Sequence, residues 1–312
     1  MRIGITFGRD QTQTAVEARA AEDAGFDLIA AGEHMFFHGP VTNGLVQLAA
    51  AAGATSRIRL LSALTVVPLY QPGVLAKLVT TLDQVSGGRF DFGVGVGGEY
   101  PPEFEASGVN VKQRGSRTDE TLDLLQQLWT GDKVDFSGKY ATIPGLQLQP
   151  GPVQAGGPPI WLGGRKDAAI RRAARYASHW MPYMYSPEQL EKSLRQVREV
   201  AAELGREPSD ISGAVYLWGA VDPDGTQSRQ WAIDFVSKVY QQDFTPLADK
   251  YLLHGSPQQV IDRIGQYLEA GAETVIFAPV GDTDQRTPDG GTDRRSAIFD
   301  TFATSVVSAL PR

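Results

Sequence analysis

The chain has 312 residues, of which 42% are hydrophobic and 21% charged, so it is long enough to bury a large core. Its 36 acidic and 29 basic residues give a net charge of −7, which argues against a nucleic-acid partner. It contains no cysteine, which excludes disulfide bonds, thiol nucleophiles and iron–sulfur clusters. We see no apolar run of about 18 residues and no signal-peptide core, so we expect a cytoplasmic protein without a membrane partner.

The first part of the chain alternates apolar strands with helical stripes. Thr14 and Glu17 have the spacing of a capping box at a helix start, and Gly25 is placed to end that helix. The stretch 58–67 is apolar throughout, as expected for a strand that is covered on both faces. The pattern predicts strand 2–7, helix 14–24, strand 26–31, helix 41–52, strand 58–67, helix 74–85 and strand 89–94.

The second part keeps this alternation after one interruption. The segment 131–159 is rich in glycine and proline, and 134–142 within it predicts a hairpin, so we interpret it as an insertion outside the main fold. Residues 281–293 have no core pattern and are expected to be mobile. The remaining elements predicted are helix 118–129, strand 160–162, helix 166–176, strand 178–182, helix 187–205, strand 211–220, helix 257–270, strand 273–278 and helix 295–310.

Eight strands separated by helices predict an α/β protein, a (β/α)8 TIM barrel with an inserted hairpin-containing segment. A doubly wound sheet is the main alternative. We find no internal repeat of fixed period and no stretch that looks like a linker, so we expect one domain over 1–312.

In such a barrel the C-terminal ends of the strands form the site. His34 follows the second predicted strand, and the glycines of 93–98 follow the fourth. Gly163, Gly164 and Arg165 follow the fifth, where glycine N–H groups and a helix start can bind a phosphate. Trp180 and Tyr183 add aromatic side chains, so the strand ends suit a planar cofactor that carries a phosphate.

Each of these features also has a structural interpretation. His34 and Trp180 could be core residues, and Gly163-Gly164 could be a simple turn. Gly93, Gly95 and Gly98 fit the GxGxxG pattern, but no acidic residue closes a second strand at the distance that a dinucleotide site requires. The four histidines do not have the spacing of a zinc site, so we expect no metal.

At these residues the chain resembles the bacterial luciferase-like superfamily of flavin- and deazaflavin-dependent oxidoreductases. The run 58–109, IRLLSALTVVPLYQPGVLAKLVTTLDQVSGGRFDFGVGVGGEYPPEFEASGV, is the most specific segment. The resemblance also extends over 21–34, 114–131, 157–183 and 254–264, and so over most of the chain.

The resemblance implies a barrel that binds FMN or the deazaflavin coenzyme F-420 (F420) at its strand ends. It implies a strand bulge at Ala63-Leu64, where we expect a cis peptide bond. Glu33 replaces the aspartate of many deazaflavin members, and it would orient His34 only if the chain turns there, because neighbours on an extended segment point opposite ways. The resulting candidates are catalytic His34 and Glu33; cofactor-binding Gly8, Ala63, Leu64, Gly97, Gly98, Glu99, Gly163, Gly164 and Arg165; and substrate-pocket Trp180 and Tyr183.

Three functions fit these features. The leading hypothesis is an F420-dependent oxidoreductase that moves a hydride between the deazaflavin and a small organic substrate. The alternatives are an FMN-dependent two-component monooxygenase, served by a separate reductase, and a non-catalytic flavin-binding protein. A lyase or isomerase of phosphate substrates is disfavoured, because it would need a lysine or carboxylate at a strand end. The resemblance also implies a homo-oligomer.

Overall fold

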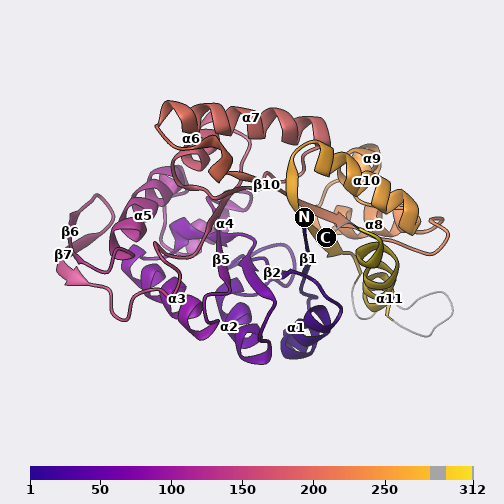
Figure 1. Ribbon diagram of the computed structural model, residues 1–312, viewed down its shortest axis with the longest axis horizontal. Coiled ribbons are helices and arrows are strands. Elements are labelled where there is room, and N and C mark those ends of the chain that lie inside the picture. The colour runs from indigo at the N-terminus through magenta and orange to yellow at the C-terminus, as the bar shows by residue number, and fades with distance from the viewer. Residues whose placement is uncertain (282–292, 311–312) are drawn as a thin grey trace.

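The computed structural model describes residues 1–281 and 293–310, and its parallel strands close into a barrel surrounded by helices (Figure 1). Within this described part the strand order is β3-β2-β1-β11-β10-β9-β8-β5-β4, and pairing of β3 with β5 closes the barrel. Strand β4 continues β3 after a break, which leaves the eight strand positions of a (β/α)8 barrel. The strands are β1 (Arg2–Thr6), β2 (Leu28–Ala31), β3 (Arg59–Ser62), β4 (Thr65–Val66), β5 (Phe90–Gly95), β8 (Ile160–Leu162), β9 (His179–Trp180), β10 (Ser212–Gly219) and β11 (Ala272–Pro279).

The helices cover the outside of the barrel (Figure 1). Ser186 and Ser256 each form a complete capping box with a proline at the first position, as their sequence signals predict. The helices are α1 (Thr14–Asp23), α2 (Gly44–Ala54), α3 (Pro72–Val85), α4 (Pro101–Ala106), α5 (Arg114–Leu128), α6 (Asp167–Tyr176), α7 (Pro187–Glu203), α8 (Ser228–Tyr240), α9 (Ala248–Tyr251), α10 (Pro257–Glu269) and α11 (Arg294–Thr301).

Three of these helices, α4, α8 and α9, are missing from the sequence prediction. The buried residues Ala232, Phe235 and Val236 of α8 do have helical spacing, so the sequence held the signal for this helix. The predicted helix 295–310 is correct only in its first half, because α11 passes into a π-helical turn at Phe302–Val306 and a 3-10 turn at Val307–Ala309.

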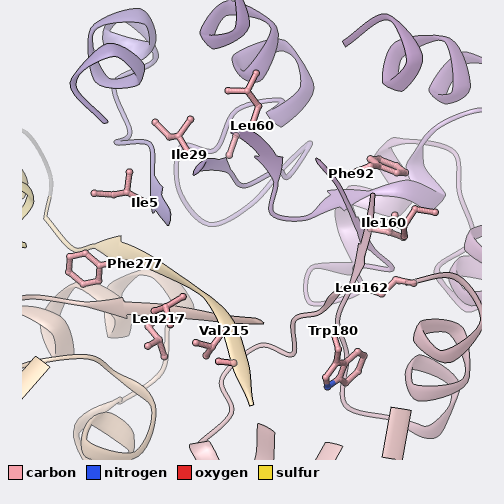
Figure 2. Packing of buried hydrophobic residues seen from close by; sticks show 14 of the residues in the cluster. Ile5, Ile29, Leu60, Phe92, Ile160, Leu162, Trp180, Val215, Leu217 and Phe277 are labelled. Atoms are coloured by element: carbon pink, nitrogen blue, oxygen red, sulfur yellow. The ribbon is translucent and has the colours of Figure 1, made fainter. Parts of the chain in front are cut away.

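Side chains of the barrel strands alternate between two buried layers, as the pleat requires. Ile5, Leu60 and Phe92 are among the residues that pack between the strands and the helices (Figure 2). Leu61 and Trp161, which alternate with such residues along β3 and β8, belong to a second cluster that fills the barrel interior. Burial on both faces explains why the strands read as continuous apolar runs.

Predicted strand 58–67 is broken in the middle. The peptide bond Ala63–Leu64 is cis, as the family resemblance implies, and it separates β3 from β4. Strand β5 approaches closely here: a Cβ added to Gly93 would lie 1.8 Å from the Ser62 carbonyl oxygen. This close approach requires glycine at position 93. The Gly93 N–H also donates a hydrogen bond to the Ser62 hydroxyl at 2.9 Å.

The insertion contains the predicted hairpin, formed by β6 (Lys133–Ser137) and β7 (Thr142–Gln147). It lies at the periphery beside α5 (Figure 1). The Glu120 carboxylate of α5 accepts the N–H groups of Lys139, Tyr140 and Ala141 at 2.7–2.9 Å, which anchors the hairpin loop.

In the described part of the chain, no helix is long and apolar enough to cross a membrane. Of the segment predicted to be mobile, 281–293, residues 282–292 lie outside the described residues.

Candidate active site

A cavity of about 1210 Å³ opens at the C-terminal ends of the barrel strands. Its walls come from the ends of β1, β2, β5, β8 and β10 and from α8. The structure therefore gathers most of the predicted site residues in one place. Those that line the cavity are Gly8, Glu33, His34, Ala63, Leu64, Gly97, Glu99, Gly163, Gly164, Arg165 and Tyr183.

Two predicted residues, Trp180 and Gly98, do not line this cavity. Trp180 is fully buried, and its indole N–H donates to the Ser193 hydroxyl of α7 at 2.9 Å. It packs in the layer between the strands and the helices with Leu162 (Figure 2). Trp180 is therefore a core residue and not a substrate contact. A Cβ on Gly98 would lie 2.8 Å from the Arg114 guanidinium, beside the wall.

His34 is held in place by a carboxylate from helix α4. Its Nδ1 lies 3.2 Å from both carboxylate oxygens of Glu103, a fully buried residue of α4. The imidazole also stacks on Phe37, with ring centroids 4.2 Å apart. A carboxylate partner places a proton on Nδ1, so Nε2 is the nitrogen that can exchange a proton with a ligand.

Glu33 has a different task from the one predicted by its position beside His34. Its carboxylate is 3% exposed and accepts hydrogen bonds from the Val66 N–H at 3.1 Å, the Gly44 N–H at 3.2 Å and the Tyr70 hydroxyl at 2.9 Å. Burial raises the pKa of Glu33 against the effect of these three donors. Glu33 thus joins β4 and α2, and Glu103 is the carboxylate that contacts His34.

The loop after β8 presents backbone and a guanidinium to the cavity. A Cβ on Gly163 would lie 2.3 Å from the Met181 carbonyl oxygen, and Gly164 has φ +147°. Helix α6 begins two residues after Arg165, and its first N–H groups have no intrahelical partner. The Arg165 guanidinium donates to the Tyr183 carbonyl oxygen at 3.0 Å. This wall is suited to an anionic group.

An adjoining wall of the cavity is aromatic. Tyr216 and Trp218 come from β10, and Tyr240 ends α8. The Trp218 indole N–H donates to the Tyr183 hydroxyl at 2.6 Å, and that hydroxyl is also hydrogen-bonded to the Tyr240 hydroxyl. Burial raises the pKa of Tyr183 well above its usual value, so its phenol stays neutral.

Sequence reasoning missed Glu103, Tyr216, Trp218 and Tyr240. The signal for α4 was present, because Pro101 is a favoured first residue of a helix. Tyr216 and Trp218 stand near the end of predicted strand 211–220, where a barrel places site residues. Tyr240 could be found only with α8, for which no element was predicted.

The cavity lies where (β/α)8 barrels build their sites, at the C-terminal ends of the strands. Residues 8–274 match the family model for the luciferase-like monooxygenases. The chain therefore belongs to the luciferase-like family, whose members are oxidoreductases or monooxygenases.

Curated relatives agree with this assignment. An uncharacterised protein of Mycobacterium tuberculosis is 34% identical over 176 residues, which is 56% of this chain and 60% of that protein. The chain thus spans less than two thirds of that relative. An F420-dependent glucose-6-phosphate dehydrogenase of Nocardia farcinica is 28% identical over 295 residues, 85% of this chain and 87% of the relative.

Solved structures share the fold. An F420-dependent secondary alcohol dehydrogenase in complex with an F420–acetone adduct superposes with a TM-score of 0.83 at 22% identity, covering 99% of both chains. The oxygenating constituent of 3,6-diketocamphane monooxygenase from Pseudomonas putida, in complex with FMN, has a TM-score of 0.78 at 20% identity over 100% of this chain and 99% of the other.

Proposed function

We propose that the chain is an F420-dependent oxidoreductase that transfers a hydride between the deazaflavin and a small organic substrate. The observation that carries this proposal is the His34–Glu103 pair on the cavity wall, with Nδ1 3.2 Å from a fully buried carboxylate. An imidazole that a buried carboxylate orients at the wall of a cavity is typical of proton-transfer sites.

The residues of the cavity fit a planar cofactor with an anionic side chain. Ala63, Leu64 and Gly97 line the cavity without a polar side chain. Gly163, Gly164, Arg165 and the first turn of α6 would hold a phosphate. When bound, the deazaflavin supplies or accepts the hydride.

The chain itself contributes proton handling at His34. Glu103 fixes the imidazole through Nδ1 and would stabilise the positive ring when Nε2 takes up a proton. Phe37 stacks on the imidazole and restricts its rotation. His34 would in this way give a proton to the substrate oxygen, or remove one, as the substrate is reduced or oxidised.

F420 is favoured over FMN because a relative that matches 85% of the chain is named as an F420-dependent enzyme. The second candidate is an FMN-dependent two-component monooxygenase with a separate reductase, and the FMN complex among the structural neighbours supports it. Glucose 6-phosphate is the first substrate to test, by analogy with that relative alone.

The proposal is tested by titrating the purified chain with F420 and with FMN. We expect F420 to bind at least about tenfold more tightly, a difference of about 1.4 kcal/mol. Turnover is then followed through cofactor absorbance with glucose 6-phosphate and simple secondary alcohols. Tighter binding of FMN, with oxygen consumption by the reduced-FMN complex, would replace this proposal by the monooxygenase.

A further inference from the structure

The barrel interior is polar toward the N-terminal ends of the strands, away from the cavity. Arg2 of β1, His179 of β9 and Thr274 of β11 each precede a residue of the layer between strands and helices, so their side chains point into the barrel. Trp161 of β8 belongs to the interior cluster. Four strands thus contribute a polar or indole side chain to this part of the interior.

These side chains meet around the Arg2 guanidinium. Arg2 donates to His179 Nε2 at 2.5 Å, and its guanidinium carbon lies 5.5 Å from the centre of the Trp161 ring. The His179 ring stacks on Trp161 with centroids 4.0 Å apart. Arg2 and Thr274 are paired in the register of β1 with β11, so their side chains are neighbours on the interior face. Side chains from three other strands therefore surround one guanidinium.

Two of these side chains carry donors that no protein group satisfies. The Trp161 indole N–H and the Thr274 hydroxyl are fully buried, and neither has a hydrogen-bond partner among the residues that the structure describes. Buried polar side-chain atoms in folded proteins are hydrogen-bonded in the large majority of cases, because an unpaired one costs stability. The two orphan donors therefore indicate an acceptor that comes from outside the chain.

The charge in this part of the barrel is positive. Arg59 is paired with the Asp91 carboxylate, whereas Arg2 has no carboxylate partner in the described part of the chain. Burial and the positive charges of Arg2 and Arg59 lower the pKa of His179 to about 3, so the ring is neutral and accepts from Arg2. One unpaired cation beside two buried donors is complementary to an anion.

We infer that the barrel interior binds a chloride ion here, held by the Arg2 guanidinium, the Trp161 N–H and the Thr274 hydroxyl. A water molecule suits these groups less well, because an indole and a guanidinium can only donate, and Thr274 alone could accept the protons of the water. The ion would offset the charge of Arg2 and stabilise the folded barrel. The site is separate from the cavity, so this inference does not depend on the proposed function.

The melting temperature of the full chain is measured in sodium chloride and in sodium gluconate of equal ionic strength, because gluconate is too large to replace a monatomic ion among buried side chains. We expect the wild type to melt about 2–4 °C higher in chloride. The difference should grow with the logarithm of the chloride concentration, as for a ligand that binds only the folded state. Bromide should have the same effect as chloride.

Thr274→Val keeps the shape of the side chain and removes the donor. In gluconate it should melt no lower than the wild type, because a buried hydroxyl without a protein partner is lost. In chloride it should show at most about a third of the wild-type rise. Thr118→Val is the matched control: the buried Thr118 hydroxyl donates to the Arg114 carbonyl oxygen at 2.8 Å, so this variant should melt lower in both salts and keep the full rise in chloride.

Crystals soaked in sodium bromide give a second readout that does not depend on variants. We expect an anomalous bromide peak in contact with Trp161 Nε1 and Thr274 Oγ1. An ordered water molecule there in place of bromide would overturn the inference. Equal melting temperatures of the wild type in chloride and gluconate, or an undiminished rise in Thr274→Val, would overturn it as well.

Discussion

His34 and Glu103 are 69 positions apart in the chain, and the site depends on their contact. His34 is 21% exposed at the cavity wall, so its loss removes few core contacts. We expect His34→Asn to change the free energy of unfolding by no more than about 1 kcal/mol. Turnover should fall about 10²-fold or more, the usual contribution of a positioned acid or base. Melting temperature and single-turnover cofactor oxidation, measured on one preparation, check both parts.

Glu103→Gln is the companion variant, because it keeps the shape of the buried side chain and removes its charge. It should lower turnover less than His34→Asn does. If His34→Asn melts early but turns over normally while folded, His34 is a core residue and has no part in the chemistry.

Arg165 offers a test of the anionic wall. Its guanidinium is exposed and, among the residues that the structure describes, donates to the backbone carbonyl oxygens of Tyr183 and Met184, so Arg165→Gln should leave stability within about 0.5 kcal/mol. We expect the dissociation constant for F420 to rise about 5- to 10-fold, and less at high salt, where charge pairing is screened. Arg171→Gln, on the exposed face of α6, is the control and should bind normally. If the two variants bind F420 with equal affinity, the phosphate of the cofactor does not bind at Arg165.

At the scale of elements, Glu33 connects three of them. It follows β2, and its carboxylate accepts N–H groups from the first residue of α2 and from β4. In Glu33→Gln one acceptor oxygen becomes a donor that faces an N–H or O–H group. We therefore expect a loss of about 1–3 kcal/mol in the free energy of unfolding, measured by urea denaturation.

Tyr70→Phe is the matched control, because it leaves the Glu33 carboxylate in place and removes one of its three hydrogen bonds, together with the bond that the Tyr70 hydroxyl accepts from Asn43. Its cost should be about 1 kcal/mol. If Glu33→Gln proves no more destabilising than Tyr70→Phe, Glu33 does not hold these elements together.

The elements also show how far the sequence could predict the structure. Periodicity found all eight barrel strands, because burial on both faces leaves long apolar runs. It could not find the break at Ala63–Leu64, which interrupts no apolar pattern; only the family resemblance pointed to it. The His34–Glu103 contact was also missed, because a hydrogen bond between residues far apart in the chain leaves no periodic pattern in the sequence. Trp180 was predicted to face the cavity, but its side chain packs against the helices, and it is the next residue, Met181, whose side chain belongs to the cluster inside the barrel.

At the scale of the whole molecule, the two ends of the barrel do different work. The C-terminal end holds the cavity, whereas the N-terminal end is closed by buried polar contacts. Arg59 pairs with the buried carboxylate of Asp91 at 2.7 and 2.9 Å. Nearby, Arg2 donates to His179 Nε2 at 2.5 Å, and the His179 ring stacks on Trp161 with centroids 4.0 Å apart. In a barrel of this kind the N-terminal end serves stability.

This end predicts how stability depends on pH. Burial, reinforced by the positive charge of Arg2, lowers the pKa of His179 from 6.5 to about 3. Between pH 6.5 and about 3, His179 is protonated in the unfolded chain and remains neutral in the folded chain. Stability from this group is therefore intact above pH 6.5 and is lost as pH falls toward 3, at up to about 1.4 kcal/mol per pH unit.

His179→Gln isolates this contribution, because glutamine can still accept from Arg2 but does not titrate. All other titratable groups are the same in both proteins, so the difference between their slopes of unfolding free energy against pH reports His179 alone. Between pH 6 and pH 4, we expect the free energy of unfolding to fall more steeply in the wild type than in the variant. The difference in slope should approach about 1.4 kcal/mol per pH unit, the value for one proton. Urea denaturation at several pH values checks this. Equal slopes would mean that His179 takes up its proton in the folded barrel, and that Arg2 does not keep the ring neutral.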